Sequence, residues 1–252
     1  MSDTYIYIRK IDREYISKNY ENLLVKLHAD RKVKTARYNN REVAVTSVAA
    51  GLLLEEIVEE KLKLLPDDIH ISEGESGKPY ICGYEDFNYN LSHSGEYVVM
   101  AYGDSPLGID IERIHKDGMQ KKDIAVAKRC FTADEYLYIT GDDKKAPDRF
   151  CMIWTMKESY LKLTGAGISV PLNSFEIDVF DMSKTSIDCN SEHNNYRYNN
   201  CSNNNCSNNN CDDITGITTH LKDKPYQYLS FKYDDYIITL CAKNISDVRL
   251  MR

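Results

Sequence analysis

The chain has 252 residues, of which 42% are hydrophobic and 28% are charged, and its formal net charge is −7. This balance is typical of a soluble globular protein and excludes a chain that is disordered throughout. The net negative charge argues against general affinity for nucleic acid, because nucleic-acid phosphates require a basic protein face.

The sequence also bounds the compartment. No run of eighteen apolar residues occurs, so we expect no association with a membrane. The N-terminal stretch MSDTYIYIRKIDREY lacks the apolar region and the cleavage site of a signal peptide. The eight cysteines are scattered through the chain rather than spaced as a disulfide framework. We therefore expect a cytoplasmic protein with reduced thiols.

The first predicted elements are a short alternating strand over residues 5–8 and a long, half-buried helix over residues 42–65. Between them, residues 26–41 carry six basic side chains against the single acid Asp30, a local charge of +5. The basic residues are Lys26, Arg31, Lys32, Lys34, Arg37 and Arg41. This stretch is either a local anion site or a solvated basic helix face, and its charge alone does not choose between them.

Strands and helices alternate through the rest of the chain. Three strands are predicted over residues 87–91, 97–102 and 107–111. Thr132 followed by Glu135 is a capping box that opens a helix, and a second helix is predicted over residues 147–164, ending at Gly165. Three further strands are predicted over residues 174–180, 226–233 and 236–242, with the last two joined as a hairpin across Asp234 and Asp235.

Residues 181–216 differ in composition from the rest of the chain. They are rich in Asn and Ser and contain the near-repeat CSNNNCSNNNC, which predicts a disordered surface insertion. A metal site formed by Cys201, Cys206 and Cys211, with His193 as a candidate fourth ligand, is the alternative, but C-x4-C-x4-C is not a usual zinc spacing.

The pattern Gly108-Ile-Asp-Ile-Glu112 falls on a predicted strand. Alternation along a strand places Asp110 and Glu112 on one face and turns Ile109 and Ile111 toward the core. Two neighbouring carboxylates repel each other unless the face is solvated or a hard cation lies between them. The pattern is therefore compatible with a metal site and also with a wet strand face.

The predicted helix over residues 147–164 carries a stripe of chemically distinct side chains. Trp154, Glu158 and Lys162 follow one another at i, i+4 spacing and share one helix face. An ordinary surface Glu–Lys pair is the simpler interpretation of this spacing. The presence of the chain's only tryptophan in the stripe favours a more specific role.

A third pattern, Asn90-Leu-Ser-His-Ser-Gly95, lies where a predicted strand runs into a turn. Its hydroxyl, imidazole and backbone N–H groups are suited to contact phosphate oxygens. A serine hydrolase with His93 as base is a rival interpretation, but the chain has no G-x-S-x-G nucleophile elbow.

The ordered set GKPYI, NLSHSG, GIDIE and FCMIWTMKESYLKLTGAGIS closely resembles the Sfp-type 4′-phosphopantetheinyl transferases. The match runs from about Gly77 to Phe175, and a looser match extends back to about Arg31. The resemblance implies an α/β (α+β) fold of two pseudo-symmetric lobes with the active site between them. We expect the lobes at residues 1–105 and 106–252, the second lobe carrying the insertion at 181–216.

The resemblance also implies the chemistry. The family transfers the 4′-phosphopantetheine group of coenzyme A to a serine of an apo acyl or peptidyl carrier protein, releasing adenosine 3′,5′-bisphosphate. The acids at family metal positions, expected to bind Mg²⁺, are Asp110, Glu112 and Glu158. The residues at family coenzyme A positions are Arg31, Lys34, Lys78, Ser92, His93 and Lys162.

Glu158 is the expected acceptor of the serine proton, although a metal-bound water is an alternative base. We expect a monomer with a carrier protein and coenzyme A as its partners. Two other functions stay open at this point: a catalytically inactive homologue that binds coenzyme A or a carrier, and a nucleotide-binding regulator with coincidental motifs.

Overall fold

The computed structural model describes residues 3–190, 195–198 and 214–251. Ten strands form one sheet in the order β4-β5-β1-β12-β8-β7-β9-β10-β11-β6, and β2 pairs with β3 separately. The strands are β1 (Asp3–Lys10), β2 (Ile71–Glu73), β3 (Pro79–Ile81), β4 (Asn88–Ser94), β5 (Tyr97–Gly103), β6 (Leu107–Arg113), β7 (Ser183–Asn190), β8 (Asn195–Tyr198), β9 (Ile214–His220), β10 (Gln227–Tyr233), β11 (Tyr236–Ala242) and β12 (Asp247–Met251).

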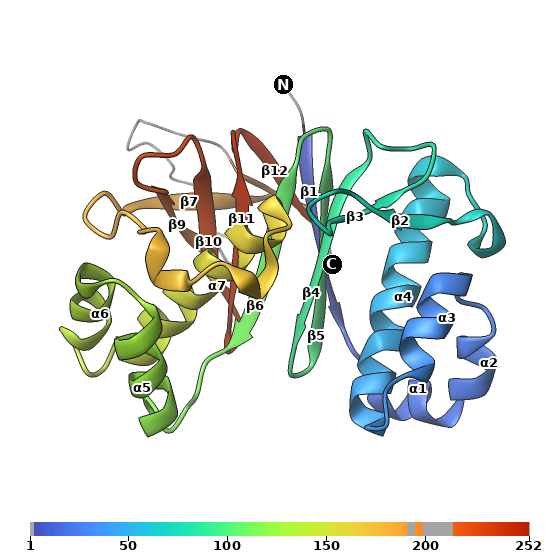
Figure 1. The fold of residues 1–252 in the computed structure, drawn as a ribbon, viewed down its shortest axis with the longest axis horizontal. Helices are drawn as coiled ribbons and strands as arrows, with labels where there is room; N and C mark the ends of the chain where they lie inside the picture. The colour runs from blue at the N-terminus through green and yellow to red at the C-terminus, as the bar shows by residue number, and fades with distance from the viewer. Residues whose placement is uncertain (1–2, 191–194, 199–213, 252) are drawn as a thin grey trace.

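Helices cover the sheet on two sides, and Figure 1 shows the N-terminal group on one side of the strands and the later group on the other. The first group is α1 (Arg13–Lys18), α2 (Tyr20–Leu24), α3 (Ala29–Ala36) and α4 (Arg41–Leu62). The second group is α5 (Lys121–Cys130), α6 (Ala133–Thr140) and α7 (Ala146–Thr164). This arrangement confirms the expected α/β class built in two lobes. The boundary between residues 105 and 106 stays a prediction.

Three apolar clusters follow from the alternation of side chains along the strands. In β5, Val98 and Met100 pack against α4, whereas Val99 and Ala101 join a central cluster shared with β6, β10 and β11. A third cluster lies between α5, α6 and α7 and the opposite face of β10 and β11. Each lobe therefore has its own helix-covered core, and the central cluster joins the two.

The two edge strands of the large sheet, β4 and β6, approach each other through side chains. Asn90 Oδ1 accepts a hydrogen bond of 2.9 Å from the backbone N–H of Ile109, and Ser94 Oγ accepts one of 3.2 Å from the N–H of Arg113. These bonds satisfy N–H groups of an edge strand that has no ladder partner there. The β4–β6 contact therefore joins a strand of the first lobe to a strand of the second.

Helix α7 lies directly on β6 because Gly108 has no side chain. A Cβ atom at Gly108 would overlap the carbonyl oxygen of Ser159 and lie 2.6 Å from the backbone N of Leu163. The helix ends, as predicted, at Gly165, which adopts φ +71°. A Cβ at Gly165 would also lie 2.7 Å from the carbonyl oxygen of Ser76 in the turn between β2 and β3.

The strand predicted over residues 174–180 is wrong. The chain forms a short 3₁₀ turn at Leu172–Ser174 and then makes a single isolated bridge between Ile177 and Leu221. The reason is that buried charges bind the backbone of this segment. Lys157 Nζ donates to the carbonyl oxygens of Leu172 and Phe175, at 2.7 Å each, which leaves these groups unavailable to a strand ladder.

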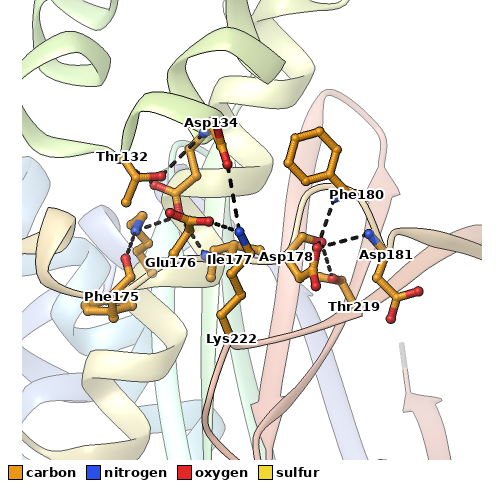
Figure 2. Close-up of polar contacts among 12 residues, drawn as sticks. Thr132, Asp134, Phe175, Glu176, Ile177, Asp178, Phe180, Asp181, Thr219 and Lys222 are labelled. Atoms are coloured by element: carbon orange, nitrogen blue, oxygen red, sulfur yellow. Dashed lines mark hydrogen bonds and ion pairs between the residues drawn. The ribbon is translucent and has the colours of Figure 1, made fainter.

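Figure 2 shows polar contacts made by this segment. Lys222 forms ion pairs with Glu176 and Asp134, and Asp178 Oδ1 accepts hydrogen bonds from the N–H groups of Phe180 and Asp181. These contacts hold the chain as a turn between α7 and β7, where the sequence predicted a continuous strand.

The disordered insertion expected over residues 181–216 differs from the structure in the part that is described. Strands β7 and β8 and the start of β9 fall within this range. A polar composition does not prevent strand pairing, because the ladder bonds are made by backbone groups. Cys201, Cys206 and Cys211 lie outside the described residues.

The other predicted elements are confirmed with small shifts of their ends, including the capping box of Thr132 and Glu135 and the hairpin of β10 and β11. Across the described ranges, none of the helices combines the length and the apolar character needed to cross a bilayer.

Candidate active site

Asp110 and Glu112 project from β6 on the face that α7 covers. Ile109 and Ile111 are buried in the central cluster, with 0% and 1% exposure, so the predicted alternation is confirmed. Asp110 is also buried, at 6% exposure, whereas Glu112 is partly exposed near the end of the strand. The strand therefore delivers one desolvated and one more accessible carboxylate to the same face.

Helix α7 places Lys162 beside Asp110. The Nζ of Lys162 lies 2.6 Å from Asp110 Oδ1, and the two side chains are 26% and 8% exposed. Glu158 lies one helical turn before Lys162 and is partly buried. The ion pair of Lys162 therefore joins α7 to Asp110 of β6 and is not merely a pair within the helix.

Ser92 reaches the same carboxylate from β4. Its Oγ donates a hydrogen bond of 2.7 Å to Asp110 Oδ1 and accepts one of 2.7 Å from Lys162 Nζ. The Ser92 hydroxyl therefore sits inside the β4–β6 contact. Sequence reasoning expected a phosphate contact here and missed this role, although Asn90, Ser92 and Ser94 at every second position signal one shared strand face.

The three acids influence one another electrostatically. Burial, followed by the nearby charge of Asp110, raises the pKa of Glu112 to about 7. Burial and then the charge of Asp110 also raise the pKa of Glu158, while Lys162 opposes this shift. Asp110, Glu112 and Glu158 thus lie close enough for the charge of Asp110 to act on the other two carboxylates.

Basic side chains of the first lobe reach the same region. Partial desolvation, and then the charges of Lys162, Lys34 and Arg31, lower the pKa of His93. Arg31 is positioned by Gly51 of α4, because a Cβ there would lie 2.9 Å from Arg31 Cγ. The structure therefore brings Arg31, Lys34 and Lys162 within electrostatic range of His93.

Lys78 joins the lobes at a neighbouring point. From the turn between β2 and β3, its Nζ donates a hydrogen bond of 2.7 Å to the carbonyl oxygen of Leu107 at the start of β6. Burial lowers the pKa of Lys78 to about 8. The Lys78 ammonium thus contacts β6 at Leu107, which lies three residues before Asp110 on that strand.

The acidic side chains of this region differ from the arrangement that a metal ion requires. Within residues 3–190, 195–198 and 214–251, no group of three or more His, Cys, Asp or Glu side chains is arranged to hold a metal ion. The chemistry of the donors nevertheless fits a hard cation, because Asp110, Glu112 and Glu158 offer carboxylate oxygens that repel one another.

The ring of Trp154 packs with Phe131 and Phe150 beside the third apolar cluster. Lys157 and Glu135, both 0% exposed, form an ion pair of 2.8 Å in the same layer. Glu135 also accepts hydrogen bonds from the N–H groups of Thr132 and Ile177. This pair fixes α7 to α6, a role that the capping-box pattern did not reveal.

Two family models match the chain. Residues 106–241 match the model described as the 4′-phosphopantetheinyl transferase superfamily. Residues 14–104 match a model described as the N-terminal part of a 4′-phosphopantetheinyl transferase. Together these matches include β4, β6 and α7, the elements that meet around Asp110.

Individual relatives give the same picture. The 4′-phosphopantetheinyl transferase Sfp of Bacillus subtilis is 31% identical over 190 residues, covering 75% of this chain and 83% of the relative. The transferase psf-1 of Bacillus pumilus is 33% identical over 171 residues, covering 68% and 71%. The L-aminoadipate-semialdehyde dehydrogenase-phosphopantetheinyl transferase of Rattus norvegicus is 29% identical over 167 residues, covering 62% and 54%.

Proposed function

Because the chain belongs to the Sfp-type 4′-phosphopantetheinyl transferases, we propose that it transfers the 4′-phosphopantetheine group of coenzyme A to a serine of an apo acyl or peptidyl carrier protein. The observation that carries this proposal is the meeting of the two lobes at Asp110. There Lys162 and Ser92 bind one carboxylate oxygen, and the charge of Asp110 acts on Glu112, Glu158 and His93.

The basic residues are proposed to hold the anionic substrate. Arg31 and Lys34 lie on α3 and are assigned to the 3′-phosphate, where charge-assisted contacts are stronger than neutral ones. The proposed contacts of the pyrophosphate are Lys78, Ser92, His93 and Lys162. This assignment is supported by the positive charges near His93. They disfavour protonation of the imidazole and favour the binding of an anion.

The acids Asp110, Glu112 and Glu158 are proposed to hold Mg²⁺. When bound, this ion supplies positive charge that offsets the charge developing on the pyrophosphate oxygens. The support is the donor chemistry of three carboxylates. Burial, and then the charge of Asp110, raises the pKa of both Glu112 and Glu158.

Glu158 is proposed to accept the proton of the carrier serine. Its raised pKa brings it closer to the working pH, which suits a general base. The serine oxygen then bonds to the β-phosphorus of coenzyme A, and the bond between that phosphorus and the bridging pyrophosphate oxygen breaks. Lys162 and Lys78 offset the charge on the leaving group, adenosine 3′,5′-bisphosphate.

We also propose a cytoplasmic monomer. Cys82, Cys130, Cys151 and Cys241 are free thiols, as expected in a reducing compartment. Light scattering of the purified protein would test the monomeric state.

Separation of the nucleotides by liquid chromatography tests the donor and the product. Incubation with coenzyme A, Mg²⁺ and an apo-carrier should convert coenzyme A to adenosine 3′,5′-bisphosphate, and omission of the carrier should prevent this. An inactive homologue predicts that coenzyme A stays intact with every carrier in a panel of fatty-acid, polyketide and nonribosomal-peptide types.

A further inference from the structure

The ammonium of Lys162 occupies a small cradle of oxygen atoms. It donates to Asp110 Oδ1 at 2.6 Å, to Ser92 Oγ at 2.7 Å and to the carbonyl oxygen of Ile109 at 3.2 Å. A lysine has three N–H donors, so these contacts use all of them. The carboxylate, hydroxyl and carbonyl that form the cradle are also the oxygen types that hard divalent cations bind.

Lys162 and a divalent cation therefore compete for the same carboxylate. An ammonium in contact with Asp110 Oδ1 repels a second cation at that oxygen, and both side chains are largely shielded from water, which strengthens the repulsion. With Lys162 bound to Asp110, the three carboxylates do not converge as metal ligands do. In the described residues, no three His, Cys, Asp or Glu side chains are arranged to hold a metal ion.

The other side of Lys162 is suited to an anion. Its charge acts on His93 together with the charges of Lys34 and Arg31, so three cationic side chains lie within electrostatic range of one imidazole. A dianion placed there would attract the ammonium away from Asp110. The long, flexible stem of lysine permits such a movement without a change in the backbone.

We propose that Lys162 blocks the metal position at Asp110 in the free protein and that a phosphate-bearing ligand opens this position by drawing the Lys162 ammonium to itself. Metal binding and phosphate binding are then positively coupled, and the coupling is reciprocal by thermodynamic necessity. This inference rests on the proposed function, because it takes the three acids as metal ligands. It adds an order of binding, in which the phosphate-bearing ligand displaces Lys162 before the metal ion binds at Asp110.

Binding of Mn²⁺, a paramagnetic substitute for Mg²⁺, tests the proposal without any assay of transfer. The electron paramagnetic resonance signal of free Mn²⁺ reports its dissociation constant for the wild-type protein, for Lys162→Met and for the control Lys224→Met. Lys224 donates to the Tyr160 hydroxyl at 2.7 Å and has no role in the site. Circular dichroism checks that all three proteins are folded.

Without any anion, Lys162→Met should bind Mn²⁺ about tenfold or more tightly than the wild type, the scale of one charge-assisted contact. Lys224→Met should match the wild type. Saturating coenzyme A should tighten Mn²⁺ binding in all three proteins, but by a smaller factor in Lys162→Met, where no block remains. Equal Mn²⁺ affinities of the wild type and Lys162→Met without anion would overturn the proposal, as would a failure of all proteins to bind Mn²⁺.

A second measurement uses the wild-type protein alone, so it does not depend on the folding of a variant. Sulfate is a tetrahedral dianion, and at ionic strength matched with chloride it should tighten Mn²⁺ binding by releasing Lys162. Unchanged or weaker Mn²⁺ binding in sulfate would contradict the proposal. If transfer to a carrier is observed while these binding results are negative, the proposed function stands and only this inference is wrong.

Discussion

Gly108 of β6 and Ser159 of α7 are in direct backbone contact, because a Cβ atom at Gly108 would overlap the Ser159 carbonyl oxygen. This contact sets how closely α7 approaches β6. It therefore sets whether Lys162, three residues after Ser159, can reach Asp110 at 2.6 Å. The contact between Lys162 and Asp110 therefore requires glycine at position 108.

The first prediction concerns this contact. Gly108→Ala should push α7 away from β6, lower the free energy of unfolding by about 1–3 kcal/mol, as overpacked sites do, and strongly reduce transfer. Gly74→Ala is the matched control, because a Cβ there would meet only Lys78 O at 3.7 Å. Urea denaturation and a transfer assay measure both effects. A Gly108→Ala protein with wild-type stability and rate would show that the approach of α7 is not required.

The second prediction concerns the buried ion pair. Lys157→Met leaves the fully buried Glu135 carboxylate without its cation, which should cost about 3–5 kcal/mol of stability. Adding Glu135→Gln should recover part of this loss, because the buried charge is then removed as well. Chemical denaturation of the single and double variants measures the recovery.

The exposed pair of Lys18 and Glu14 provides the control for this experiment. Its side chains are 71% and 78% exposed, so Lys18→Met should change stability very little. If Lys157→Met and Lys18→Met had equally small effects, the pair would not be what holds α7 to α6.

These two contacts also show how far the sequence reaches. Alternation along β6 predicted the common face of Asp110 and Glu112, and helical spacing predicted the shared face of Glu158 and Lys162, since both depend only on local geometry. The approach of α7 to β6 could not be predicted in this way. It depends on Gly108 meeting residues about fifty positions later in the chain, at Ser159 and Leu163.

The segment after α7 shows the converse case. Residues 174–180 have the composition of a strand, yet Lys157 and Glu135 bind the backbone groups of Leu172, Phe175 and Ile177. A buried ion pair formed between two helices thus overrides local preference. The pairing of β1 with β12 likewise could not be predicted from local sequence patterns, because it joins residues 3–7 to residues 247–251.

The third prediction concerns the basic residues of α3. If Arg31 and Lys34 bind the 3′-phosphate, the wild type should prefer coenzyme A to dephospho-coenzyme A, and the double variant Arg31→Ala with Lys34→Ala should lose that preference. Contacts to a charged group are worth about 1.5–3 kcal/mol each, so the KM for coenzyme A should rise about tenfold or more. The kcat should change less, since these residues are remote from the reacting phosphorus.

Steady-state kinetics with both cofactors measures this effect, and Lys26→Ala is a control from the same basic stretch. Equal, small changes for the two cofactors would favour the solvated basic face. A loss of affinity for the carrier with coenzyme A binding intact would instead identify α3 as a surface that docks acidic carriers.

The fourth prediction concerns pH. Burial lowers the pKa of Lys78 from 10.5 to about 8, so its positive charge is lost as the pH rises through about 8. The kcat/KM for coenzyme A, which reports groups of the free enzyme, should therefore fall above this pH. Lys78→Arg should fall less, because a guanidinium keeps its charge. A wild-type kcat/KM that stays constant to pH 9.5 would contradict the assignment.

Stability should respond to the same group in the opposite direction. The unfolded chain keeps this lysine protonated up to about pH 10.5, whereas the folded protein releases the proton near pH 8. The unfolded state thus binds more protons between these values, and the contribution of Lys78 to the free energy of unfolding increases with pH there. Comparison of wild type and Lys78→Met by denaturation at pH 7 and pH 9.5 isolates this contribution.

The most direct test of the central claim is the mass of an apo-carrier after incubation with coenzyme A, Mg²⁺ and either the wild-type protein or Glu158→Gln. The wild type should add the mass of one phosphopantetheine group at a single serine of the carrier. The Glu158→Gln variant should add no mass to the carrier, because its side chain lacks the carboxylate proposed as base and metal ligand. It should keep the wild-type melting temperature, because Gln and Glu have nearly the same size and shape. An unmodified carrier with the wild type, or an equally fast gain of mass with Glu158→Gln, would contradict the account.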